Sequence, residues 1–344
     1  MDAAQRELPS LIESVGAGAT PFVYPAAGLL SRVLAHLGLD LPPEVCFGLG
    51  CELDFALPGR GGGEGAAGFG ERRFHRHLSH ALGLWFWEAR THTPRSFLQF
   101  LLDEWLDFAG KQQPLPILVW LPLEGPTEPA LLLAVDEGGD ALHFLSGTSG
   151  RMHRRTRAEL EALALPEYVH AIFHPPLNFL RQDGKFRPMG SAVRHALVQT
   201  VHQLEVGFGG TGLTALASLA RRMAEGEGAA EEWRELARFY LTRSRHDQEE
   251  NGLFRRTFAA FLDRVGAALE EPAFGQAAEL YRDLARRWSG WLRLCDALLT
   301  GAVAPAEFRA ESAMALQALH QAEAQAVATL RRCLDGMAAV GVAG

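Results

Sequence analysis

The stretch Ala130-Leu131-Leu132-Leu133-Ala134-Val135-Asp136-Glu137-Gly138-Gly139-Asp140-Ala141-Leu142-His143-Phe144-Leu145-Ser146 contains two apolar runs separated by a polar, glycine-containing centre. Each run has the length of a buried strand. Paired glycines are typical of hairpin turns, because glycine adopts the positive φ angles that these turns require. The stretch therefore predicts two neighbouring antiparallel strands, 130–136 and 141–146.

Further apolar runs extend the predicted sheet. Residues 116–122 and 168–173 are short and apolar, as expected for strands. A short helix is predicted at 157–163, and amphipathic helices are predicted at 29–37 and after Pro94, where apolar residues recur every three or four positions. Because the strands do not alternate regularly with helices, we predict an α+β fold with an antiparallel sheet and not a parallel βαβ array.

The segment 46–55 (CFGLGCELDF) interrupts this pattern. Its glycines disfavour a helix, and its apolar residues favour burial. We therefore expect a strand or a tight turn here.

The sequence pattern changes near residue 185. Glycine and proline separate short apolar runs before this position, whereas long stretches with a helical period follow it. We therefore predict two domains, residues 1–185 (α+β, with an antiparallel sheet) and residues 186–344 (all-helical). The predicted helices of the second domain are 189–206, 211–225, 230–243, 252–270, 274–299 and 305–338. Its predicted core includes Phe254, Phe258, Phe261, Val265, Trp288 and Trp291.

Composition and charge exclude several classes of protein. The 344 residues include 33 basic and 41 acidic side chains, which leave a net charge of −8. Because no basic stripe could neutralise phosphates, we expect no nucleic-acid partner. The apolar runs are too short to span a membrane and the N-terminus lacks a signal-peptide core, so we expect a cytoplasmic protein. The absence of a CxxC pair predicts free thiols and no zinc site at the four cysteines, Cys46, Cys51, Cys295 and Cys333.

Two kinds of cluster resemble ligand sites but have simpler interpretations. The glycine-rich segment 207–212 has no preceding strand and no following Lys-Ser or Lys-Thr pair, so it predicts a linker between helices and not a phosphate loop. The histidines of segment 75–80, with His92 nearby, and the pair His170 and His174 favour solvated or hydrogen-bonded imidazoles over metal ligands. We expect neither a metal ion nor an organic cofactor.

Several motifs together resemble a known family. Segment 22–38, followed by 47–50 (FGLG) and Phe55, resembles the N-terminal domain of the butirosin-biosynthesis acyltransferase (BtrH-like) family. Segments 252–262 and 278–288 resemble the helical companion domain of unknown function that follows it in many members. The resemblance implies a papain-like α+β fold, a Cys-His-Asp triad and transfer of an acyl group from a carrier-protein thioester to an amine. A thiolate at a helix N-terminus suits this chemistry, because the helix lowers the pKa of the thiol.

The sequence departs from the family at each position of the triad. The nucleophile position holds Pro25, and Tyr24 precedes it. Glu128 or Pro129 occupies the histidine position just before the predicted strand 130–136. Ser146 occupies the position at the end of the next strand where the resemblance implies an aspartate. Proline cannot act as a nucleophile, and neither of the other two positions holds the residue that the family requires. The nucleophile, the histidine and the aspartate are therefore absent together.

These departures favour a catalytically silent member of the acyltransferase fold. Such a protein would bind a carrier protein, a peptide or a small molecule, or would serve as an assembly subunit in a biosynthetic pathway. The resemblance implies that the positions equivalent to the family's pocket are Tyr24, Pro25, Glu128 and Ser146.

Two other functions remain open. An acyltransferase or hydrolase acting on a carrier-protein thioester could use a relocated nucleophile, for which Cys51 is the best candidate and Glu52 a carboxylate partner. Because neighbours on a strand point to opposite faces, its base would come from His75, His77 or His92. Alternatively, a purely structural protein would form homo-oligomers through the alanine-rich last helix and would bind neither a carrier protein nor a small molecule.

Overall fold

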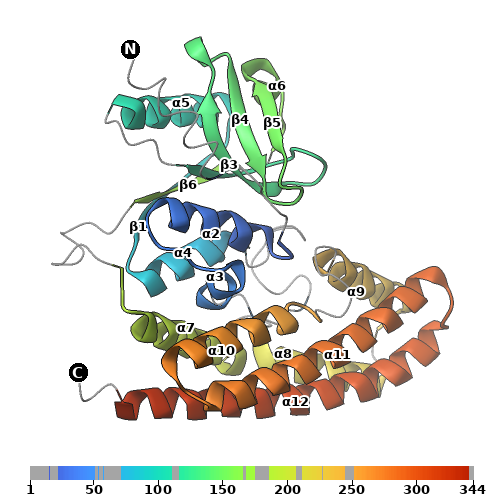
Figure 1. Cartoon of the computed structure of the whole chain (residues 1–344). Helices are drawn as coiled ribbons and strands as arrows, with labels where there is room; N and C mark the ends of the chain where they lie inside the picture. The colour runs from blue at the N-terminus through green and yellow to red at the C-terminus, as the bar shows by residue number, and fades with distance from the viewer. Residues whose placement is uncertain are drawn as a thin grey trace. The chain divides into compact units, whose positions relative to one another are not determined.

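The two apolar runs around Gly138 and Gly139 form a β-hairpin in the computed structural model (Figure 1). Strands β3 (Glu128–Val135) and β4 (Ala141–Ser146) pair in antiparallel fashion, and a 3-10 turn at Glu137–Gly139 connects them. Gly138 and Gly139 have φ angles of 85° and 77°, which residues with a side chain rarely adopt. The predicted hairpin is confirmed.

The structure describes residues 15, 22–50, 53, 57, 71–110, 116–165, 168–174, 186–206, 211–226, 228–244 and 252–340.

The chain divides into two compact units. The first unit comprises Met1–Cys46 and Leu82–Phe186, and the second comprises Phe47–Ala81 and Arg187–Gly344. The predicted domain boundary, between residues 185 and 186, lies next to the last of three changes of unit along the chain, between Phe186 and Arg187. Residues 47–81 group with the helical second half, although they precede the sheet in the sequence.

The sheet of the first unit is antiparallel throughout. Among the described residues its strand order is β1-β6-β2-β3-β4-β5. The predicted strands correspond to β2, β3, β4 and β6, whereas the two edge strands, β1 and β5, were not predicted. The remaining strand bounds are β1 Trp85–Thr91, β2 Ile117–Leu121, β5 Met152–Thr156 and β6 Tyr168–His174.

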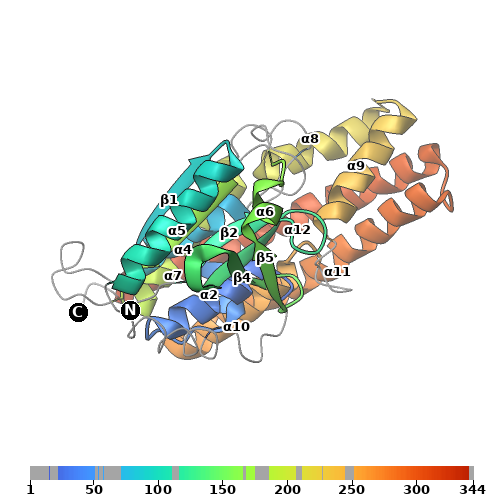
Figure 2. The same cartoon turned by 90° about the horizontal axis from the view of Figure 1, so that it is seen from above.

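Helices α2 (Pro25–His36), α5 (Pro94–Gly110) and α6 (Arg157–Glu161) accompany this sheet in the part of the first unit that the structure describes. Helix α2 has proline at its first position, where a missing N–H costs no helical hydrogen bond. Its apolar face is buried, and the helix contacts β3. Helix α5 contacts β1, β6 and the short helix α6, and Figure 2 shows α5 beside β1. The predicted α+β architecture is confirmed.

One local prediction is wrong. Residues 46–49 are neither a strand nor a turn but the last part of helix α3 (Pro43–Leu49). The glycine within this helix serves close packing, because a Cβ atom on Gly48 would overlap the ring of Phe261. Most of the remaining segment 50–55 lies outside the described residues.

The second unit is helical. The predicted helices of the second half are confirmed, and α4, from the first half of the sequence, joins them. Helix α11 packs against both α10 and α12 (Figures 1 and 2). The bounds are α4 Glu71–Leu82, α7 Met189–Val206, α8 Gly212–Glu225, α9 Ala230–Arg243, α10 Arg255–Leu269, α11 Ala273–Thr300 and α12 Pro305–Val340.

The core of the second unit is rich in aromatic side chains. All six predicted core residues are buried, which confirms that prediction. Phe258 contacts Tyr281 with ring centroids 4.8 Å apart, and Trp288 contacts Trp291 at 5.7 Å. Edge-to-face arrangements of this kind add to the free energy of burial. No described helix has both the length and the apolar composition that are needed to cross a membrane.

Candidate functional site

The three positions that the resemblance assigns to a triad meet at one end of the sheet. Glu128 opens β3 and Ser146 ends β4, where the register pairs Ala130 with Ser146. Gly147 follows Ser146, and a Cβ atom on it would lie 3.1 Å from Cβ of Pro25. The start of α2 therefore lies against the turn that follows Ser146, as a helix-borne nucleophile beside a His-Asp pair would require.

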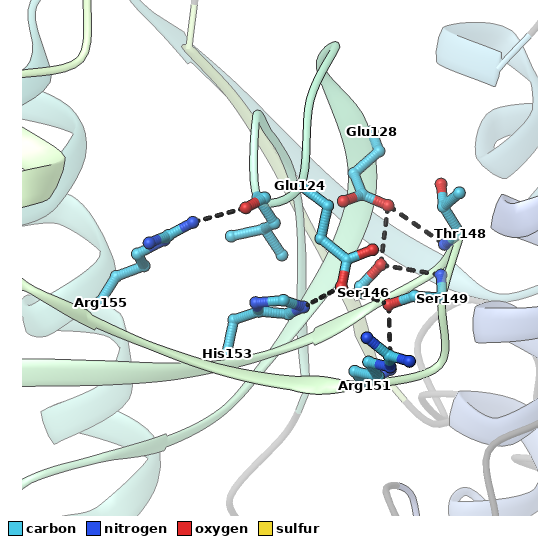
Figure 3. A network of polar contacts seen from close by, with 9 residues as sticks. Glu124, Glu128, Ser146, Thr148, Ser149, Arg151, His153 and Arg155 are labelled. Atoms are coloured by element: carbon cyan, nitrogen blue, oxygen red, sulfur yellow. Dashed lines mark hydrogen bonds and ion pairs between the residues drawn. The ribbon is translucent and has the colours of Figure 1, made fainter.

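A network of hydrogen bonds occupies this place (Figure 3). The Ser146 hydroxyl donates to Oε2 of Glu128 over 2.8 Å, and the Thr148 N–H donates to the same oxygen over 3.1 Å. The Ser149 N–H donates to the Ser146 hydroxyl over 3.0 Å. Glu128 and Ser146 therefore bond to each other and to the turn, where a catalytic pair would bond to a nucleophile.

The residues at the positions that the resemblance assigns to the family's pocket are themselves buried. Tyr24 is 5% exposed, Glu128 6% and Ser146 0%, and Pro25 is also buried. Oxygen Oε1 of Glu128 has no hydrogen-bond partner within the described parts of the chain, and Figure 3 shows it turned away from Ser146 and Thr148. A substrate could reach these side chains only after they had moved.

A second carboxylate beside this pair contacts both a hydroxyl and an imidazole. Oε1 of Glu124 accepts a hydrogen bond from the Ser149 hydroxyl over 3.0 Å and lies 2.9 Å from Nε2 of His153 (Figure 3). A serine nucleophile needs the imidazole between hydroxyl and carboxylate. Here the carboxylate lies in the middle, so the imidazole does not take up the hydroxyl proton in this arrangement.

Sequence reasoning missed Glu124, Ser149 and His153. They come from the β2–β3 connection, the β4–β5 turn and the edge strand β5. The sequence spacing between these residues carries no signal, because the successive pairings of β2, β3, β4 and β5 bring them together. Recognition of β5 as a strand would have been the necessary first step.

The opposite end of β3 carries another polar cluster. Asp136 lies 2.6 Å from Nε2 of His143 and accepts a hydrogen bond from Arg154 over 2.8 Å. These two partners lower the pKa of the Asp136 carboxyl. Since Asp136 and Glu128 lie at opposite ends of the same strand, this aspartate is not part of the site at Pro25.

The relocated site stays a prediction, because Cys51 and Glu52 lie outside the described residues. Of the bases considered for it, His75 is buried and His92 is exposed. The three described cysteines are buried, and burial raises the pKa of each thiol, so they are poor nucleophiles: Cys46, Cys295 and Cys333. Cys295 packs within α11 and Cys333 within α12.

The predicted histidine clusters contain no metal site in the part of the chain that the structure describes. His170 instead lies in an aromatic cluster, with ring centroids 4.5 Å from Phe100 and 5.7 Å from Trp87. Burial lowers the pKa of His170 to about 4, so the imidazole is neutral at physiological pH.

Comparison with known proteins bears on the second half of the chain. Residues 176–330 match the family described as a domain of unknown function, DUF4872. No curated protein matches the sequence. The matched region contains the helices α7 to α11 and most of α12. It is the region in which the motifs resemble a helical companion domain of unknown function.

Proposed function

We propose that this chain is a catalytically silent relative of the BtrH-like acyltransferases, retained as a binding or assembly subunit. The observation that carries this proposal is the convergence of Pro25, Glu128 and Ser146. The proximity of these three positions supports their correspondence to a triad, and their side chains bond or pack against the protein itself.

The chemistry of these residues argues against acyl transfer at this place. Pro25 has no group that could form an ester or a thioester. The Ser146 hydroxyl is fully buried and donates to a carboxylate, which leaves it without an activating imidazole. The match of residues 176–330 to a domain of unknown function supports the two-domain resemblance without assigning an activity to it.

The proposal is tested by incubating the full chain with a small acyl thioester, such as an N-acetylcysteamine ester, and measuring intact mass. A silent site predicts no acyl adduct and no thioester hydrolysis above background. Cys51→Ala is the matched control. An adduct on the wild type that disappears in Cys51→Ala would instead establish the alternative function, an acyltransferase or hydrolase with a relocated nucleophile.

A second experiment tests whether the three positions correspond to a triad. The triple variant Pro25→Cys, Glu128→His, Ser146→Asp is compared with Pro25→Cys alone. A thiol at a helix N-terminus beside an imidazole has a lowered pKa. We therefore expect the triple variant to be alkylated by iodoacetamide at about pH 6 at least tenfold faster than the single variant. Equal rates would contradict the proposed correspondence.

A further inference from the structure

A strained turn precedes helix α10 in the second unit. Gly252, Leu253 and Phe254 have φ angles of 56°, 51° and 67°, so three consecutive residues adopt the left-handed conformation. Glycine adopts it freely, whereas leucine and phenylalanine are strained in this conformation because of their Cβ atoms. Contacts elsewhere in the unit must therefore hold this turn in place.

Two contacts fix the backbone of the turn. A Cβ atom on Gly252 would overlap the backbone of Ala285 in α11, so only glycine allows this approach. The Nη1 group of Arg255 donates to the carbonyl oxygen of Leu253 over 3.0 Å. The side chain of Arg255 thus turns back onto the strained residues that precede it.

Arg255 is held in turn by a buried carboxylate from another helix. Its Nε and Nη2 groups both lie 2.8 Å from Oε1 of Glu323 in α12, and its guanidinium lies 5.2 Å from the ring centroid of Trp288. The indole N–H of Trp288 donates to the same Oε1 atom over 2.7 Å. Arg255 and Glu323 are each 1% exposed. Together with Trp288 in α11, the pair of Arg255 and Glu323 therefore joins α10, α11 and α12.

The pair is better suited to specifying a conformation than to stabilising the unit. Moving two charges out of water costs about as much free energy as their attraction returns. The second oxygen of Glu323, Oε2, and the hydroxyl of Tyr281 are also buried without a hydrogen-bond partner in the described parts of the chain. Such unpaired atoms lower the stability gained from the cluster.

The strained turn faces a segment from the N-terminal half of the sequence. The ring of Phe254 lies 5.7 Å from that of Phe47, and Gly48 packs beneath the ring of Phe261. We propose that the Arg255–Glu323 pair is a conformational lock, which holds the left-handed turn so that Phe254 and Phe261 clamp residues 47–50 onto α10. The lock makes a segment from the start of the chain part of the helical unit.

The test separates conformation from stability. Amide hydrogen exchange and the thermal midpoint are measured on the full chain for the double variant Arg255→Met, Glu323→Leu and for Glu323→Leu alone. The single variant leaves a buried charge unpaired, and we expect its midpoint to fall by about 10 °C. The double variant should keep its midpoint within a few degrees, yet exchange about tenfold faster at residues 47–50 and 252–256.

The matched control replaces the exposed pair Arg238 and Glu231 with Met and Leu, which should leave exchange at both segments unchanged. Unchanged exchange in the Arg255→Met, Glu323→Leu variant would overturn the lock. A midpoint as low as that of Glu323→Leu would also overturn the lock, because the pair would then be stabilising.

If the double variant does not fold, Glu323→Gln keeps the shape of the side chain and removes its charge. Exchange that rises severalfold at the same two segments supports the lock, and unchanged exchange overturns it.

Discussion

Gly147 shows how closely the residues around Pro25, Glu128 and Ser146 are packed. A Cβ atom there would lie 2.8 Å from the carbonyl oxygen of Pro129, 3.0 Å from Leu29 and 3.1 Å from Pro25. The first of these neighbours is backbone and cannot rotate away. Strand β3 and helix α2 therefore leave no room for a side chain at position 147.

We predict that Gly147→Ala lowers the free energy of unfolding by about 1–3 kcal/mol, because the added methyl group must push the backbone of β3 or the start of α2 aside. Urea denaturation measures the change. Gly125→Ala is the control, since nothing lies within 4 Å of a Cβ atom there, and it should leave stability unchanged or slightly raised. Equal effects at the two positions would show that the site is not closely packed.

Phe258 shows close packing in the helical unit. Its side chain is fully buried and contacts both Phe261 and Tyr281. We predict that Phe258→Ala costs about 3–5 kcal/mol of unfolding free energy through lost burial and the cavity that remains. Met314→Ala, on a residue 68% exposed, should change stability by less than about 0.5 kcal/mol. A small effect of Phe258→Ala would contradict the packing of α10 against α11.

The aromatic cluster between α5 and the sheet gives a pH dependence at the scale of elements. Burial lowers the pKa of His170 in β6 from 6.5 to about 4, partly offset by the charge of Glu88. As the pH falls from about 6.5 to about 4, the unfolded chain binds a proton that the folded chain does not. The stability due to neutral His170 is therefore complete above pH 6.5 and is lost across this range.

We predict that His170→Phe removes this pH dependence. The wild type should lose about 3 kcal/mol more unfolding free energy than the variant between pH 7 and pH 4. Urea denaturation at a series of pH values gives both curves, and their difference cancels the other titrating groups. Parallel curves would mean that His170 accepts a proton without disturbing the contacts to Phe100 and Trp87.

The elements also show what a sequence can predict. Strands β2 and β3 are buried along their length, so their continuous apolar runs were recognisable. Among the described strands, β5 pairs with β4 alone, and its sequence, MHRRT, carries no strand pattern. Glu124, Ser149 and His153 were missed for this reason. Pro25, Glu128 and Ser146 were found through the family resemblance, but their mutual packing depends on the register of β3 and β4.

Segment 47–81 matters most at the scale of the whole molecule. It precedes the sheet in the sequence, yet it belongs to the helical unit. Phe47 contacts Phe254 in the turn before α10, Gly48 packs against Phe261 in α10, and Gly50 packs beneath the ring of Phe74 in α4. The helices that follow residue 186 thus complete their core with side chains from the first quarter of the chain. The change of composition near residue 185 gave no sign of this exchange, because it reports local periodicity and not contacts between distant segments.

We therefore predict that residues 187–344 alone do not form a fully packed unit. The fragment should retain its far-ultraviolet helical signal but bind the dye ANS and unfold without a sharp transition, because Phe254 and Phe261 lose the segment that covers them. A fragment in which residues 47–81 are joined to 187–344 by a flexible glycine-serine linker should unfold cooperatively and bind little dye. Calorimetry of the two fragments measures how sharp the thermal unfolding transition of each one is. A sharp transition in the shorter fragment would show that the helices pack without the N-terminal segment, and that the clamp on residues 47–50 only joins two parts that fold independently.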